Sequence, residues 1–454
     1  MPNAIAYLAL FAWPLVGALL FHKLPTHKAI IWTILGGYLV LPERVGIDLP
    51  LLPAFDKTFI PAATALFFCL PRLGSLWELL PQDRVASVLA LTFMLSPFGT
   101  AFTNGDPQIF GPTYLPGLRP YDAFSFGLSH AVHLVPFLLA QRFIRNEAAL
   151  RDLLASIAIA GLIYSLPALF EVRMSPQLHT WIYGFFPHSF IQQVRFGGFR
   201  PVVFLGHGLL VGLLISMSTL ASLALARGHQ GPARALWIAA SIWLAITLLL
   251  SKTVSAWVYA VALFPVLLLF GNRLKRMALL FVGSIVLLYP ALRGMDLIPT
   301  ARIEALAALI NEARFQSLQY RFQNEDILLQ RANERPFFGW GGWGRNEVHD
   351  NITGDVISVT DGAWIAFAGP YGWIGYIAGF GLLVRPLIMI GLGRKASFTT
   401  LALAVVLMAN LIDLIPNSGL RPITWLVSGS IIGFICLEYR DKALRKPAYA
   451  KIRA

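Results

Sequence analysis

Residues 201–226 read PVVFLGHGLLVGLLISMSTLASLALA, a stretch of 26 residues without one Asp, Glu, Lys or Arg. An α-helix rises 1.5 Å per residue, so about 20 mostly apolar residues cross the hydrocarbon core of a bilayer. The stretch therefore predicts a membrane-spanning helix that begins near Pro201, a residue suited to the first turn of a helix. It sets the expected class of fold for the whole chain.

The composition extends this expectation to the rest of the sequence. Of the 454 residues, 57% are hydrophobic and only 13% are charged, whereas soluble domains carry about 25% charged residues. We predict an all-α fold, a polytopic transmembrane helical bundle of about 12–13 spans with one large, partly helical extracytoplasmic loop. The other candidate spans are 4–22, 28–43, 58–71, 85–103, 121–141, 151–171, 234–250, 253–271, 276–292, 362–384, 398–414 and 422–437.

The distribution of basic residues predicts the orientation. The short connections on one side, with the C-terminal tail, carry 21 of the 36 lysines and arginines, and such loops face the cytoplasm. The long connections 173–200 and 294–361 then face outward. The chain divides into N-terminal helices (1–172), central helices with the aromatic and arginine-bearing loop 173–200 (173–293), the large outward loop (294–361), and C-terminal helices with a basic cytoplasmic tail (362–454). The net charge of +13 is attributed to these basic cytoplasmic segments, and no nucleic-acid partner is expected.

The outward loop 294–361 gathers arginines. Its first part has apolar residues at helical spacing, and Asn333-Glu334-Arg335-Pro336 is expected to break this pattern, because proline disfavours helix at the residue before it. Arginine binds phosphate through a bidentate fork, so the loop predicts an anionic ligand. Arg314, Arg331 and Arg335 are interpreted as simple helix charges. The six arginines are Arg302, Arg314, Arg321, Arg331, Arg335 and Arg345.

Two further features of the outward loops have alternative interpretations. Arg195 and Arg200 stand at the predicted outer mouth of the seventh span, either as ligand-binding groups or as snorkelling anchors. Trp340 and Trp343 lie in a glycine-rich run, where their rings could stack on sugar or lipid or simply pack at the interface. Loop 173–200 is rich in aromatic residues and is expected to lie along the membrane surface.

Ionisable residues inside the predicted spans are functional candidates. His130 and His133 share one helix face, and His207 lies in the seventh span; structural, hydrogen-bonded roles are favoured because no further metal ligands accompany them. Asp413, at the outer end of the twelfth span, either pairs with an outward arginine or is a solvated carboxylate at a helix end.

Four segments carry a resemblance to a known family. The segments are RFGGFRP at 195–201, SKTVSAW at 251–257, Arg321 followed by RPFFGWG at 335–341, and DGAW at 361–364 followed by PYGWIG at 370–375. Together they resemble motifs of the bacterial O-antigen ligase and polysaccharide polymerase superfamily of inner-membrane glycosyltransferases. Lys252 stands where arginine is usual in that superfamily, and Asp361 stands where histidine is usual.

The resemblance implies a reaction on the periplasmic side of the inner membrane. The donor would be an undecaprenyl-pyrophosphate-linked oligosaccharide in the lipid bilayer, and the acceptor a glycan or lipid A core. No metal or other cofactor would take part. Arg200 and Arg321 would hold the pyrophosphate, with Arg195 and Lys252 in support.

The departure at Asp361 leaves three alternatives open for the proton acceptor. The Asp361 carboxylate could serve as the base or orient the acceptor; His349, earlier in the same loop, could supply an imidazole; or the site has lost this function.

A transporter or lipid flippase is the competing class, because it would also have many spans and buried charges. Transporters often contain internal repeats, and the two halves of this sequence show no similarity to each other. A channel would need rings of pore-lining polar residues, which are not evident. A purely structural scaffold would leave the loop arginines unexplained.

Overall fold

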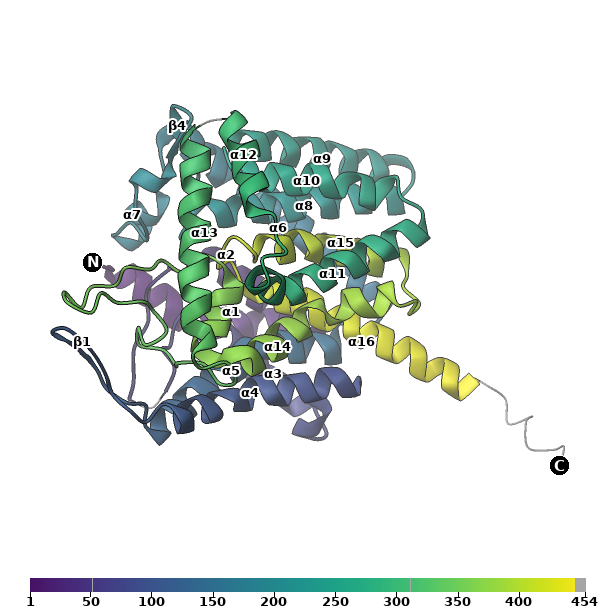
Figure 1. Ribbon diagram of the computed structural model, residues 1–454. Helices are drawn as coiled ribbons and strands as arrows, with labels where there is room; N and C mark the ends of the chain where they lie inside the picture. The colour runs from purple at the N-terminus through teal and green to yellow at the C-terminus, as the bar shows by residue number, and fades with distance from the viewer. Residues whose placement is uncertain (51, 311, 446–454) are drawn as a thin grey trace.

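The computed structural model describes residues 1–50, 52–310 and 312–445 (Figure 1). The all-α class is confirmed, since each predicted span coincides with a helix and the described strands form only two short hairpins. Nine of the described helices are long and apolar enough to cross a membrane. The helices of the bundle are α1 (Ala4–Lys23), α2 (Thr26–Val40), α3 (Phe59–Cys69), α4 (Arg84–Thr103), α5 (Pro120–Phe143), α6 (Glu147–Met174), α8 (Gly208–Gly228), α9 (Gly231–Leu250), α10 (Val254–Leu268), α11 (Asn272–Gly294), α14 (Ala363–Gly391), α15 (Phe398–Asp413) and α16 (Pro422–Arg445).

Helix α8 belongs to the core of the bundle. Within its most apolar window 89% of the residues are buried, compared with 22% for α9 and 28% for α1. The outer helices instead expose large apolar side chains such as Leu15, Leu236 and Val261. A helix that is apolar all round and enclosed by others forms the core, whereas apolar side chains left on the outside suit contact with lipid. The core and the lipid-facing surface are thus built from the same residue types.

The connections between helices separate into two groups at opposite ends. We call the end that contains 175–207, 295–362 and 414–421 the arginine-rich end; it also holds the N-terminus, whereas the C-terminal end of α16 lies on the other side (Figure 1). The short connections lie at the opposite end, where Arg385 donates two hydrogen bonds of 2.9 Å to the carboxylate of Asp83. The grouping agrees with the predicted alternation of spans. Three basic residues of the C-terminal tail, which is predicted to be cytoplasmic, lie outside the described residues: Lys446, Lys451 and Arg453.

The arginine-rich end carries most of the non-spanning structure. The helical pattern of the long loop forms two helices, α12 (Thr300–Ile310) and α13 (Glu312–Asn333), and α13 ends at the start of the predicted break. Arg293, at the end of α11, is buried and lies 2.7 Å from Asp326 and 3.6 Å from Glu325, which attaches α13 to the bundle. The remaining elements here are α7 (Leu178–Tyr183), η3 (Ile191–Gln193), α12 (Thr300–Ile310), α13 (Glu312–Asn333), β1 (Gln108–Phe110) paired with β2 (Thr113–Leu115), and β3 (Val194–Arg195) paired with β4 (Gly198–Phe199); η1 (Leu70–Arg72) and η2 (Leu76–Leu79) lie at the opposite end.

The seventh span begins later than the sequence predicts. Helix α8 starts at Gly208, and Pro201 begins an irregular segment instead of a helix. Two residues in this segment have left-handed backbone, Val203 with φ 50° and Gly206 with φ 79°, and a right-handed helix excludes both. The apolar composition of 201–207 reflects burial in an irregular conformation, which periodicity alone does not distinguish from helix.

Candidate functional site

A buried carboxylate fixes the irregular segment that carries Arg200. Glu171, in the last turn of α6, is fully buried, and one of its oxygens accepts hydrogen bonds of 2.7 Å from the backbone N–H groups of both Val202 and Val203. Its other oxygen accepts from the N–H of Leu178 at 2.9 Å. Because α8 starts only at Gly208, the N–H groups of Val202 and Val203 have no partner within a helix, and the carboxylate of Glu171 supplies one. The position of Arg200 is set by this attachment.

The two segments that resemble superfamily motifs near Arg200 contact each other. Strands β3 and β4 form a hairpin whose turn has left-handed backbone at Phe196 and Gly197, and which leaves Arg195 exposed. Lys252, in the turn between α9 and α10, donates from Nζ to the carbonyl of Phe196 at 3.3 Å. The Nε of Arg200 donates to the carbonyl of Lys252, also at 3.3 Å. Arg195, Arg200 and Lys252 are thus held at one place by the hairpin and the turn.

Arg321 reaches the bundle from α13. Its Nε lies 3.5 Å from a carboxylate oxygen of Asp361, just before α14, and its Nη1 donates to the carbonyl of Pro416 at 3.3 Å. The side chains of Arg321 and Asp361 are about one-third exposed, at 32% and 35%. The pair therefore keeps access to solvent and to a ligand, although it joins two segments far apart in the sequence.

A second carboxylate, that of Asp413, is buried within the electrostatic influence of Arg321. Asp413, at the end of α15, is 2% exposed and accepts a 2.8 Å hydrogen bond from the side chain of Asn417. The hydroxyl of Tyr259 also hydrogen-bonds to it, and the charge of Arg321 acts on both groups. Asp413 is consequently not a solvated carboxylate at a helix end, and of the two predicted alternatives the structure favours its association with an outward arginine.

His207 lies among the arginines and caps α8. Its Nδ1 accepts a hydrogen bond from the N–H of Leu209 at 3.0 Å. Burial, together with the nearby positive charges of His188, Arg200, Arg195 and Arg321, lowers the pKa of His207 to about 4. The imidazole is therefore neutral near pH 7, and since Nδ1 accepts, Nε2 carries the proton. The sequence placed His207 inside a span, because it predicted an early start for the helix.

The predicted residues at 195–200, 252, 321 and 361 thus gather at one end of the bundle. His207 falls within the electrostatic influence of all three of Arg195, Arg200 and Arg321. These arginines come from a hairpin, an irregular segment and a long surface helix. Sequence reasoning did not assign His207 or Tyr259 to the site, because their places follow from the irregular segment and from the packing of α10 against α15.

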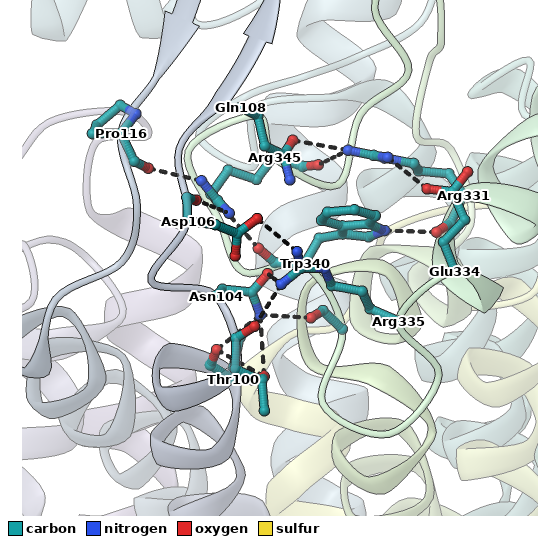
Figure 2. A network of polar contacts seen from close by, with 12 residues as sticks. Thr100, Asn104, Asp106, Gln108, Pro116, Arg331, Glu334, Arg335, Trp340 and Arg345 are labelled. Carbon is teal, nitrogen blue, oxygen red and sulfur yellow. Dashed lines mark hydrogen bonds and ion pairs between the residues drawn. The ribbon is translucent and has the colours of Figure 1, made fainter.

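Of the two alternatives for Trp340, the structure favours packing over a role as a stacking platform. Its ring is 7% exposed and lies between the guanidinium groups of Arg331 and Arg335, whose central carbons are 3.5 and 4.3 Å from the ring centroid (Figure 2). The indole N–H donates to the carbonyl of Arg331. Cation–π contacts of this kind are structural where no face of the ring is left free. Trp340 therefore packs internally.

The interpretation of Arg331 and Arg335 as simple helix charges is wrong. Arg335 lies 2.7 Å from a carboxylate oxygen of Asp106, and the fully buried Arg345 donates to the backbone carbonyls of Trp340, Asp106 and Pro116 (Figure 2). These arginines attach the 334–345 segment to the connection between α4 and α5. The side chain of Arg314 lies outside the described residues.

The glycine-rich run forms a joint with α14. Gly372, inside α14, has φ 64°, and a Cβ built there would lie 2.6 Å from the backbone nitrogen of Gly339. A Cβ on Gly339 would in turn lie 2.5 Å from the nitrogen of Gly372. Such distances exclude any side chain, so both positions require glycine. Two of the segments that carry the family resemblance are therefore complementary halves of one backbone contact.

The other predicted residues take different places. The imidazole of His349 is buried and stacks on Phe110 with ring centroids 4.6 Å apart, so it belongs to the packing of the β1–β2 hairpin. Trp343 is 68% exposed and remains available for stacking. His130 is buried against Phe93 and hydrogen-bonds to its carbonyl, which confirms its structural, hydrogen-bonded role.

Among the described residues no group of three or more His, Cys, Asp or Glu side chains is arranged to hold a metal ion. The fold and site define a polytopic helical membrane protein with cationic side chains gathered at one end of the bundle. Residues 239–380 match the family model described as O-antigen ligase, which supports placement of the chain in the O-antigen ligase and polysaccharide polymerase superfamily. Neither the curated proteins nor the solved structures gave a match.

The matched range includes Lys252, Arg321 and Asp361, but it begins after Arg195 and Arg200. The contacts of Arg200 and of the β3–β4 hairpin with Lys252 connect those two arginines to the matched domain.

Proposed function

We propose that this protein transfers a glycan from an undecaprenyl-pyrophosphate-linked donor to a sugar hydroxyl of an acceptor. The single observation that carries the proposal is the arrangement of Arg200, Arg321 and Asp361. They come from separate connections of a membrane-embedded bundle and lie at the same end of it. A lipid-linked diphosphate supplies both the anionic group that arginines bind and the apolar chain that a bilayer accommodates.

In the proposed reaction the acceptor oxygen attacks the anomeric carbon of the donor sugar. The bond between that carbon and the phosphate oxygen breaks, and undecaprenyl pyrophosphate leaves with the bonding electrons. The hydroxyl proton passes to the carboxylate of Asp361. Arg200 and Arg321 stabilise the negative charge that develops on the leaving oxygen, with Arg195 and Lys252 in support.

The ion pair between Arg321 and Asp361 gives the site a way to respond to its donor. The Nε of Arg321 lies 3.5 Å from a carboxylate oxygen of Asp361. A diphosphate competes for the same guanidinium with more charge and more acceptor oxygens. When Arg321 turns to the diphosphate, the carboxylate of Asp361 is released from the ion pair and can accept a hydrogen bond from the acceptor hydroxyl. His349 does not fit this role because it is stacked on Phe110.

The proposed setting is the bacterial inner membrane, with the arginine-rich end in the periplasm and the C-terminus in the cytoplasm. The excess of lysine and arginine in the short connections supports this orientation. Between the two acceptors that the superfamily uses, we favour a polymerase of surface polysaccharide or exopolysaccharide, because Asp361 in place of histidine marks a divergent site.

The test uses purified protein in proteoliposomes with a lipid-linked repeat unit and product sizing by mass spectrometry. We expect glycans longer than the substrate, and their loss in R321A and D361N. The exposed Arg302 of α12 offers the matched control, and R302A should keep wild-type products. Movement of unchanged lipid-linked glycan across the bilayer without elongation would instead favour a flippase.

A further inference from the structure

A large groove lies beside α5, apart from the arginines of the proposed active site. Its volume is 780 Å³, within the range of about 300–1,000 Å³ typical of ligand pockets. The groove is bounded by residues 48–50, 52–54, 56, 58 and 59, by the segment that leads into α5, and by Trp343. The exposed rings of Trp343 and Tyr121, at 68% and 46%, contribute to its lining.

One face of α5 contributes a polar stripe to the groove. Tyr121, Ser125, Ser129 and His133 follow one another at intervals of four residues and all line the cavity. At 1.5 Å per residue the stripe is about 18 Å long, so it reaches from the end of the span deep into it. Polar side chains within a span normally face protein or water. This stripe therefore indicates a hydrated groove and disfavours a polyprenyl chain as its occupant.

The hydrogen bonding of His133 gives the stripe a free acceptor. The Nδ1 of His133 lies 2.8 Å from the carbonyl oxygen of Ser129. A carbonyl oxygen can only accept, so Nδ1 carries the proton and Nε2 of the neutral ring is an acceptor. Hydroxyls of Ser125, Ser129 and Tyr121 can donate or accept. Such a row, next to exposed aromatic rings, matches the alternating hydroxyls and apolar faces of a sugar chain.

The charge of the groove is opposite to that of the arginine site. Asp48, Asp56 and Asp122 line it, and among its described lining residues Arg119 is the one lysine or arginine. Asp56 accepts from the N–H groups of Thr58 and Phe59, and Asp122 from that of Arg119, so both carboxylates are fixed in place. A diphosphate would be repelled here. A glycan without acidic groups would not.

One segment separates the groove from the arginine site. Lys57 points away from the groove and donates to Glu43 at 2.8 Å and to the carbonyl of Phe204 at 2.9 Å, in the segment that carries Arg200. Its neighbours Asp56 and Thr58 line the groove. Residues 56–58 therefore lie between the groove and the segment that carries Arg200, with Asp56 and Thr58 toward the groove and Lys57 toward that segment.

We propose that this groove binds the non-acidic acceptor glycan, separately from the diphosphate of the donor. This assignment rests on the proposed function for its role in transfer, but the binding itself does not. The acceptor sugars stack on Trp343 and Tyr121, and their hydroxyls bond to the serines and His133. The donor diphosphate stays with Arg200 and Arg321.

The experiment measures binding without catalysis. The probe is the free oligosaccharide that mild acid releases from the lipid-linked intermediate of the producing cells, titrated onto the full-length protein in lipid nanodiscs. The test variant is S125L/S129L, which replaces the hydroxyls by apolar groups that a membrane span tolerates. The control variant S284L places the same side chain at a half-exposed serine of α11. Undecaprenyl pyrophosphate without sugar is the second probe.

We expect S125L/S129L to weaken oligosaccharide binding by about tenfold or more, the effect of losing one good polar contact. S284L and R321A should bind the oligosaccharide as the wild type does, and S125L/S129L should bind undecaprenyl pyrophosphate normally. Unchanged oligosaccharide binding by S125L/S129L would overturn the proposal, as would loss of undecaprenyl pyrophosphate binding in that variant. If oligosaccharide binds in the groove but no transfer occurs, the proposed function fails and the binding site stands.

Discussion

Replacing Glu171 by glutamine removes the attachment that positions Arg200. One carboxylate oxygen accepts from the N–H groups of both Val202 and Val203 at 2.7 Å. Hydrogen bonds to a charged group contribute about 1.5–3 kcal/mol each. A glutamine in one orientation points its NH₂ group at the N–H groups of Val202 and Val203, which cannot then be paired. In the other orientation its oxygen pairs with them, but the N–H of Leu178 loses its acceptor. The side chain carries no charge in either case. At the lower value the loss of two bonds is about 3 kcal/mol.

A change of about 3 kcal/mol corresponds to roughly a hundredfold shift in the local opening equilibrium. We therefore predict that E171Q accelerates hydrogen exchange in a peptide covering residues 200–207 by about that factor. Hydrogen exchange with mass spectrometry, on protein in nanodiscs, measures it directly. The KM for the lipid-linked donor should rise, because Arg200 loses its fixed position.

The matched control is E147Q, at the opposite end of the same helix, where the carboxylate bonds to Thr399. This variant should leave exchange in 200–207 unchanged. If E171Q altered exchange in that peptide by less than threefold while the protein remained folded, the reasoning that Glu171 holds the segment would be refuted.

Three further predictions concern stability, pH and metal dependence. W340A should destabilise the protein by about 3–5 kcal/mol, because the ring is buried between two arginines, while W343A, at an exposed ring, should leave the melting temperature nearly unchanged; thermal unfolding compares the two. The pKa of His207 is lowered from its ordinary 6.5 to about 4 in the folded protein, so the unfolded chain binds more protons between these values and stability should fall as pH drops from 6.5 to 4. In H207N, whose side chain can still cap α8, this part of the pH dependence should disappear from the melting curves. EDTA should not slow transfer in proteoliposomes, and restoration of a lost rate by added Mg²⁺ or Mn²⁺ would contradict the proposed chemistry.

Hydrophobic length and charge were sufficient to predict the helical bundle. The spans follow from runs of about 20 apolar residues, and the end of α13 follows from the restriction that Pro336 places on Arg335. The start of α8 could not be predicted in this way. Residues 201–207 are as apolar as a helix, and their irregular path depends on Glu171, a residue about 30 positions earlier in the chain.

The site was partly predictable for a similar reason. Arginines in outward loops indicated Arg200 and Arg321, but their proximity depends on where α13 lies over the bundle. Nothing in the residue pattern distinguishes Trp340, enclosed by Arg331 and Arg335, from the exposed Trp343 three residues later. His207 became a member of the site only through the late start of α8. Long-range packing decides each of these cases.

The central claim is that Arg200 and Arg321 hold one diphosphate. A double-mutant cycle measures it directly, with the affinity for undecaprenyl pyrophosphate determined in nanodiscs for the wild type, R200A, R321A and R200A/R321A, and with R302A as the control. We predict that each single substitution weakens binding by about tenfold to a hundredfold. The fold-loss of affinity in the double variant should be clearly smaller than the product of the two single fold-losses. Normal affinity in both single variants, or an equal loss of affinity in the control R302A, would contradict the account.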